Sequence, residues 1–321
     1  HNLLGSLDNN GTMTGSGTFN FIPSSAATID FGADFSSSGT VVLGSTGAIT
    51  VAGTPVSFNN VLISNTHASG ITPASDWEIL NDFTVNGSST FHAGAHTYSV
   101  GNNIQVDGTL DAGTSTFILN GTDHQDIFNT SGFYNLTLDK AADVATLFAN
   151  TSVNGTLHFI SGNLNTDEYA LVQSATAAVT GAAQNTGWVN GLLQKGVATG
   201  ATSKTFEVGD ATTYAPVNLA FSNVTTAGSL TVSTTAGDHP GIANATINAS
   251  KSVNRYWKLL NSGTLYNNYS ATFHFATGDL DSGVDTLLLG ADLYDGSSWR
   301  LPVTVLKRST FVQASNITET G

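Results

Sequence analysis

The residues of this sequence that could do chemistry are few and widely spaced. His92 and His96 lie four positions apart, which in a β-strand puts both side chains on one face. With a nearby Asp, such a pair could hold zinc or copper, but an outward polar face often carries surface histidines. We therefore expect two surface histidines at these positions rather than a metal site.

An acidic segment further along imitates the start of a calcium-binding loop, with Asp279, Asp281 and Asp285 at its first, third and seventh positions. An EF-hand has Gly at its sixth position and Glu at its twelfth, where this segment has Val284 and Gly290. The EF-hand interpretation therefore fails. The three carboxylates are weak candidates for loosely bound calcium, with a solvated acidic turn as the alternative, and no other cofactor is indicated.

The segment from Asp123 to Asp126, with His124 inside it, is the compact acid/base cluster of the first half. Elongated β-helices can carry polysaccharide lyases and hydrolases. A uronate lyase needs a cation to neutralise the substrate carboxylate, and no Lys or Arg precedes Lys140. A glycosidase needs convergent carboxylates, and no Asp-Asp or Asp-x-Asp grouping precedes Lys140 either. The sequence therefore predicts no enzymatic activity.

A cation next to an aromatic side chain forms a further candidate. Strand alternation places Arg255 and Trp257 on one face, where they could stack on a sugar. A Trp in such a strand is more often a core residue. We therefore expect Trp257 in the core and Arg255 bonded to a carboxylate or a carbonyl.

The distribution of charge divides the chain into two regions of different composition. Residues 1–139 contain eleven carboxylates and no Lys or Arg, whereas residues 140–321 hold all nine basic side chains against twelve acidic ones. Because phosphate recognition relies on clustered Lys and Arg, neither nucleic acid nor an anionic membrane is an expected partner. No apolar run is long enough for membrane insertion. The chain has no Cys, which excludes disulfides and thiolate sites.

The first half repeats short strand-and-turn elements. A tetrad of Val, a small or polar residue, Gly and a hydroxyl residue begins at Val51, Val85, Val106 and Val153. We expect each copy to end a short strand in a turn. Repeats with unequal spacing and Gly or Asn corners predict an irregular β-solenoid over residues 1–164, whose turns bury their inward residues by stacking on one another.

From about residue 165 the pattern changes to longer alternating strands, including segments 269–275 and 285–290. Asp295 and Gly296 lie between two apolar pairs and predict a hairpin turn. Alternating faces at this spacing predict an immunoglobulin-like antiparallel β-sandwich over residues 165–321. The expected fold class is all-β, with no helix of ten residues.

Four segments of the second half resemble a module of large secreted surface proteins of Bacteroidota and Chlorobi-type bacteria: Gly191-Leu192-Leu193-Gln194-Lys195, Lys204-Thr205-Phe206-Glu207-Val208-Gly209-Asp210, Tyr214-Ala215-Pro216-Val217 and Val253-Asn254-Arg255-Tyr256-Trp257. The resemblance covers roughly residues 150 to 320. It implies a C-terminal β-rich module that follows β-solenoid repeats in a type IX secretion context, at the cell surface or released, with no catalytic residue to carry over. The sequence departs from that pattern by lacking a sorting domain, which a processed end would explain.

The two ends of a solenoid offer unpaired backbone groups, and the sequence shows no capping helix at either end. We therefore expect an extracellular structural surface protein. It would be a filament or fibre subunit that assembles head to tail with its own copies, by strand complementation or solenoid stacking. The assembly candidates are Phe19, Phe21, Ile22 and Phe311.

The alternative function is a monomeric adhesin or stalk fragment that binds surface glycans through exposed aromatic residues such as Trp77, Trp188 or Trp299. The chain also contains twelve Asn-x-Ser/Thr sequons. The glycosylation candidates among them are Asn10, Asn86, Asn120, Asn154 and Asn244.

Overall fold

The computed structural model describes residues 2–54 and 56–320. These residues form strands, turns and two short 3-10 segments, and no α-helix occurs among them. The chain divides into two compact units: the first contains the residues up to Asn165 with Ala177–Gly181, and the second contains Thr166–Thr176 and the residues from Ala182 onward. Within the described ranges the structure contains no helix that could cross a membrane.

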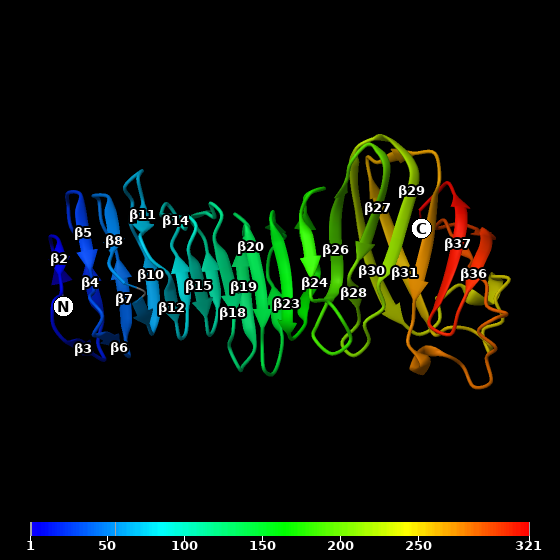
Figure 1. Ribbon diagram of the computed structural model, residues 1–321, viewed down its shortest axis with the longest axis horizontal. Helices are drawn as coiled ribbons and strands as arrows, with labels where there is room; N and C mark the ends of the chain where they lie inside the picture. Colours follow the sequence, from blue (N-terminus) through cyan, green and yellow to red (C-terminus); the bar gives the residue numbers. More distant parts are fainter. Residues whose placement is uncertain (1, 55, 321) are drawn as a thin grey trace. The chain divides into compact units, whose positions relative to one another are not determined.

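The first unit is a β-solenoid, as predicted, in which each turn of the chain adds strands to parallel sheets (Figure 1). The first sheet contains β1 (Asn2–Leu3), β4 (Phe19–Phe21), β7 (Thr40–Leu43), β10 (Asn60–Ile63), β13 (Phe83–Val85), β16 (Ile104–Val106), β19 (Gln125–Asn129), β21 (Ala145–Leu147) and the start of β24 (Leu164–Gln173). The short strand β22 (Thr151–Val153) also pairs with β24.

Two further sheets complete the turns. The second contains β2 (Leu7–Asp8), β5 (Ala27–Asp30), β8 (Ile49–Ala52), β11 (Ile71–Pro73), β14 (Thr90–His92) and β17 (Thr109–Asp111). The third contains β9 (Val56–Phe58), β12 (Trp77–Ile79), β15 (Thr97–Val100), β18 (Thr116–Leu119), β20 (Asn135–Asp139), β23 (Thr156–Ser161) and β25 (Ala178–Thr180), while β3 (Met13–Gly15) pairs with β6 (Phe35–Ser37).

The register between turns explains the burial pattern. Phe19 pairs with Val41, Val41 with Val61, and Val61 with Phe83, so a turn takes 20 to 22 residues over this stretch. All four side chains are buried, whereas their neighbours along each strand face outward. The four repeated tetrads behave as predicted, because Val85, Val106 and Val153 are the buried last residues of their strands and Val51 is buried one residue before the end of its strand.

Aromatic rings form much of the solenoid core. Neighbouring rings contact one another at centroid distances of 4.9 to 5.8 Å along the series Phe31, Phe58, Trp77, Tyr98, Phe117 and Phe133. Edge-to-face and tilted contacts of this kind stabilise beyond the apolar area that they bury. Trp77 is 2% exposed, so the prediction that it is a surface aromatic is wrong: it is an inward residue of β12, held between Phe58 and Tyr98.

The second unit consists mainly of longer, antiparallel strands. One sheet contains β24, β26 (Val189–Val197), β30 (Gly228–Ala236) and β31 (Arg255–Ser262), with β28 (Val208–Gly209) beside β26. Another contains β27 (Gly200–Phe206), β29 (Val217–Thr226), β33 (Tyr269–His274), β37 (Phe311–Ile317) and β36 (Val303–Lys307), with β32 (Leu265–Tyr266) beside β29. A hairpin of β34 (Leu293–Tyr294) and β35 (Trp299–Arg300) and the segments η1 (Ile242–Asn244) and η2 (Thr277–Asp279) complete it.

Two of the strand predictions for this unit have different outcomes. The hairpin turn at Asp295 and Gly296 is confirmed, because β34 and β35 pair across it. The strand expected at 285–290 is wrong: Asp285 accepts hydrogen bonds from the backbone N–H groups of Leu287 and Leu288, which bends this segment into a turn. The all-β class is confirmed, and an immunoglobulin-like arrangement stays a prediction.

Candidate functional site

The second unit contains a groove of about 1120 Å³. Its floor is apolar and comes from Leu259 of β31, Phe273 of β33 and Val312 and Ala314 of β37. The indole ring of Trp257, also on β31, packs against the ring of Phe273 at 5.1 Å. A large concave surface of this composition is the usual form of a binding site, so the groove is the first candidate for function.

Exposed leucines form the rim of this groove. Leu260 lies on β31, while Leu288 and Leu301 lie on the connecting segments and are 77% and 67% exposed. Exposed leucines scattered singly are normal on protein surfaces, but here three of them line one groove together with buried apolar side chains. A partner that covered the groove would remove the rim and the floor from water together.

A strand with a free edge runs along the groove. β31 pairs with β30 in an antiparallel register that runs from Ala236 opposite Arg255 to Leu230 opposite Asn261. Within the described residues no strand pairs with the opposite edge of β31, and β36 is likewise the last strand of its sheet. Unpaired backbone N–H and C=O groups at such an edge can accept an added strand.

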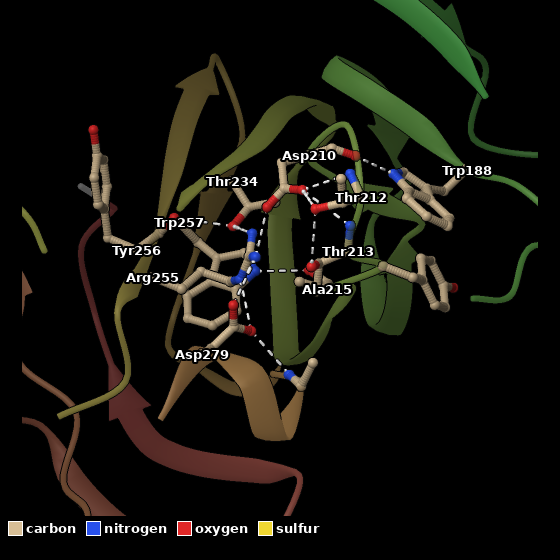
Figure 2. Close-up of polar contacts among 12 residues, drawn as sticks. Trp188, Asp210, Thr212, Thr213, Ala215, Thr234, Arg255, Tyr256, Trp257 and Asp279 are labelled. Carbon is tan, nitrogen blue, oxygen red and sulfur yellow. Dashed lines mark hydrogen bonds and ion pairs between the residues drawn. The ribbon is translucent and has the colours of Figure 1, made fainter. Parts of the chain in front are cut away.

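Arg255 anchors the start of β31 (Figure 2). Its guanidinium donates from Nε to Oδ2 of Asp279 at 3.0 Å and from Nη2 to Oδ1 of Asp279 at 2.9 Å, a bidentate pair. Nη2 also donates to Oδ2 of Asp210 at 2.6 Å. The Arg255 side chain is only 1% exposed, so the prediction that it bonds to a carboxylate is confirmed.

The two carboxylates are fixed by further hydrogen bonds. Oδ1 of Asp210 accepts the backbone N–H groups of Thr212 and Thr213, and Oδ2 of Asp279 accepts that of Ala276 at the start of η2. Burial opposes ionisation of Asp210, but the hydrogen bonds from Thr212 and Arg255 outweigh it and lower the pKa of Asp210. The cluster thus ties β31 to two distant segments, and its chemistry is that of a structural anchor.

An aromatic cluster lies at one side of the groove. The imidazole ring of His239 contacts the rings of Tyr256, Tyr294 and Trp299 at 5.0 to 5.1 Å. Trp299 is partly exposed and donates from Nε1 to the carbonyl of Gly241 at 3.1 Å. Figure 2 shows Tyr256 pointing away from Arg255, as strand alternation requires.

Two other predicted roles for tryptophans have clear outcomes. Trp188 is buried and donates from Nε1 to the carbonyl of Asp210, so the prediction that it is an exposed glycan contact is wrong. Trp257 is partly buried and donates from Nε1 to the carbonyl of Ala215 at 2.8 Å, so its packing against Phe273 agrees with the predicted core role.

The three calcium candidates do not converge. Asp279 binds Arg255, Asp281 accepts hydrogen bonds from Ser252 and Asn254, and Asp285 binds the backbone of its own turn. Among residues 2–54 and 56–320, no group of three or more His, Asp or Glu side chains is arranged to hold a metal ion.

The two histidines expected at the surface, His92 and His96, have different partners. Nδ1 of His92 lies 2.9 Å from Oδ2 of Asp111, whereas Nδ1 of His96 lies 3.6 Å from Oδ1 of Asp76. Each imidazole therefore faces a carboxylate from a different turn, and the structure does not bring the two rings to one ligand.

The assembly candidates occupy different environments. Phe19 and Phe21 are inward residues of β4, which lies between β1 and β7, so they pack in the solenoid's own core. Ile22 is partly exposed, and the ring of Phe311 at the start of β37 contacts that of His274. In the described chain the outer edges of the first turn belong instead to β1, β2 and β3.

The five glycosylation candidates share one property, which is exposure to solvent: Asn10, Asn86, Asn120, Asn154 and Asn244.

The sequence analysis does not predict the groove. Its rim includes leucines of the segment 285–290, for which the sequence predicts a strand.

No protein family model matches this sequence, and comparisons with curated proteins and with solved structures find no similar chain.

Proposed function

We propose that this protein is a structural subunit of an extracellular fibre, and that its copies join head to tail by strand complementation. The observation that carries the proposal is the free edge of β31 beside an apolar groove of about 1120 Å³. A strand added to that edge gains backbone hydrogen bonds along its length. Its alternate side chains enter the groove and lose contact with water.

The donor in this proposal is the first solenoid turn of a second copy. Its strands β1, β2 and β3 each have one edge without a partner strand in the described chain. Leu4, which follows β1, is 71% exposed and supplies an apolar side chain at that edge. Contact between such an edge and β31 needs no charged recognition, which fits a solenoid half without Lys or Arg before Lys140.

Composition and sequence resemblance support the extracellular setting. The chain has no Cys, and its first 139 residues offer no Lys or Arg to trypsin-like proteases. The resemblance of the second half to modules of secreted bacterial surface proteins points in the same direction. An immunoglobulin-like sandwich, with β31 at one edge, is the arrangement that we propose for the second unit.

Site-directed cross-linking tests the contact. Because the natural chain has no Cys, single variants Leu4→Cys and Leu301→Cys each carry one thiol. We expect a short bismaleimide linker to join the two variants into a mixed dimer when they are combined. The matched control is Leu265→Cys, which is 60% exposed on β32 and does not line the groove. Equal cross-linking of Leu4→Cys to positions 301 and 265 would contradict the proposed contact.

Electron microscopy of the protein as released from cells tests the assembly itself. We expect regular filaments whose axial repeat equals one subunit. Dispersed monomers at all concentrations tested would exclude a fibre subunit.

A further inference from the structure

A second hollow, of about 570 Å³, lies on the outward face of the first solenoid sheet. It is independent of the groove in the other unit. Its lining combines two aromatic rings with carboxylate, amide and hydroxyl groups: Asp82, Thr84, Asn103, Gln105, Asp126, Phe128 and Phe148, together with Ile104.

The two aromatic rings are unusual for this solenoid, whose other phenylalanines are buried. Phe128 pairs in register with Gln105, and the backbone N–H of Phe148 donates to the carbonyl of Ile127 at 2.8 Å. Phe128 and Phe148 therefore occupy equivalent outward positions on successive turns. Phe148 is 45% exposed, and its outward direction leaves the core to its neighbour Leu147.

The polar groups of the hollow are held in place by their neighbours. Oδ1 of Asp82 accepts the backbone N–H of Asn103 at 3.1 Å, and Oδ1 of Asn103 accepts that of Asp126 at 2.8 Å. Oδ1 of Asp126 lies 3.0 Å from Nε2 of His124. In the described chain Oδ2 of Asp82 and of Asp126 has no hydrogen-bond donor, so both oxygens can accept hydrogen bonds from a ligand.

The charge of the site restricts its ligand. No Lys or Arg lines the hollow, and the nearest basic residue in sequence, Lys140, is buried and donates to the carbonyls of Gly121 and Asp123. An acidic polysaccharide or a phosphate would meet two carboxylates without a Lys or Arg in the lining to compensate their charge. Hydroxyl groups, by contrast, donate to carboxylates, and the C–H faces of sugar rings pack on aromatic rings.

From these observations we propose that the hollow binds a neutral polysaccharide, with sugar rings on Phe128 and Phe148 and hydroxyls donating to Asp82 and Asp126. The site would add glycan attachment to the solenoid of a structural protein. It does not depend on the fibre contact, because it uses only side chains on the outer face of the first unit.

Affinity electrophoresis in native gels tests this site with mixed-linkage β-glucan, galactomannan, xyloglucan and alginate as probes. We expect at least one of the three neutral polymers to retard the full chain and alginate to have no effect. The double variant Phe128→Ala/Phe148→Ala should weaken retardation by about tenfold or more, because it removes both rings on which the sugars would pack. Tyr134→Ala removes a similarly exposed ring outside the hollow and should change nothing.

Three outcomes would overturn the proposal: no retardation by any neutral polymer, equal retardation by alginate, or unchanged retardation of the double variant. Circular dichroism and thermal unfolding of the variants separate loss of binding from loss of fold. We expect both to match the natural chain, because the two side chains point away from the core.

Discussion

At the scale of single residues, the first basic side chain of the sequence is buried inside the solenoid. The ammonium of Lys140 donates to the carbonyl of Gly121 at 2.9 Å, to that of Asp123 at 2.7 Å and to Oε1 of Gln125 at 2.8 Å. Burial lowers the pKa of Lys140 to about 8, although the nearby carboxylates of Asp143 and Asp123 oppose the shift. The ammonium gives a donor to the carbonyls of Gly121 and Asp123 and a second donor to Oε1 of Gln125, which also accepts the backbone N–H of Gly121, and this explains why a cation is retained there.

This environment predicts a stability difference that depends on pH. The folded pKa of about 8 lies below the ordinary 10.5, so folded protein loses this proton first as the pH rises. Between these values the unfolded state binds more protons, and the free energy of unfolding rises with pH. We expect the natural chain to gain stability over Lys140→Met from pH 8 to pH 10.5 in urea unfolding followed by circular dichroism. Parallel pH profiles for the two proteins would contradict the shifted pKa.

A second residue-scale prediction concerns the anchor of β31. Arg255→Met leaves the buried carboxylate of Asp279 without its cation, which costs about 3–5 kcal/mol in comparable buried pairs. The pair of Arg300, whose side chain is 56% exposed, with Asp295 provides the control, and Arg300→Met should cost much less than Arg255→Met. Urea unfolding followed by tryptophan fluorescence measures both, because three of the four tryptophans lie in the second unit. Similar decreases in the free energy of unfolding of the two variants would contradict the structural role assigned to Arg255.

At the scale of elements, the groove rim predicts which substitutions block assembly. Leu301→Asp would carry a charge into the proposed interface, where desolvation is costly, but should leave the fold unchanged because the side chain is exposed. Leu265→Asp is the matched control away from the groove. We expect sedimentation to show that Leu301→Asp loses the polymer and that Leu265→Asp keeps it at the natural level. Polymer from Leu301→Asp at the natural level would exclude this groove as the contact.

How far the sequence predicts these elements depends on how local their causes are. The buried tetrad valines follow from strand alternation and nearby Gly turns, and they led to the solenoid. The sequence predicts that Arg255 bonds to a carboxylate or a carbonyl, but Asp210 lies 45 residues away, and no local pattern links the two. The leucines near position 288 have strand-like composition, yet the hydrogen bonds of Asp285 turn the chain there.

The groove could not be predicted for a related reason. It exists because one side of β31 has no neighbouring strand in the described chain, and a missing neighbour has no signature in the sequence of β31 itself. Trp77 shows the same limit for single residues. A tryptophan can have either a core or a surface role, and only the register of Trp77 with Val56 and Tyr98 assigns it to the core.

At the scale of the whole molecule, net charge predicts how assembly responds to salt. Each chain carries a formal charge of −14, so neighbouring subunits in a fibre repel one another. The screening length falls from about 30 Å at 0.01 M salt to about 8 Å at 0.15 M, which weakens that repulsion. An interface of backbone pairing and leucine burial does not depend on charge pairs between subunits. We therefore expect the sedimenting fraction to rise with NaCl over this range, measured at constant protein concentration and pH 7. A fraction that falls with salt would indicate charge-steered association and would contradict an apolar strand contact.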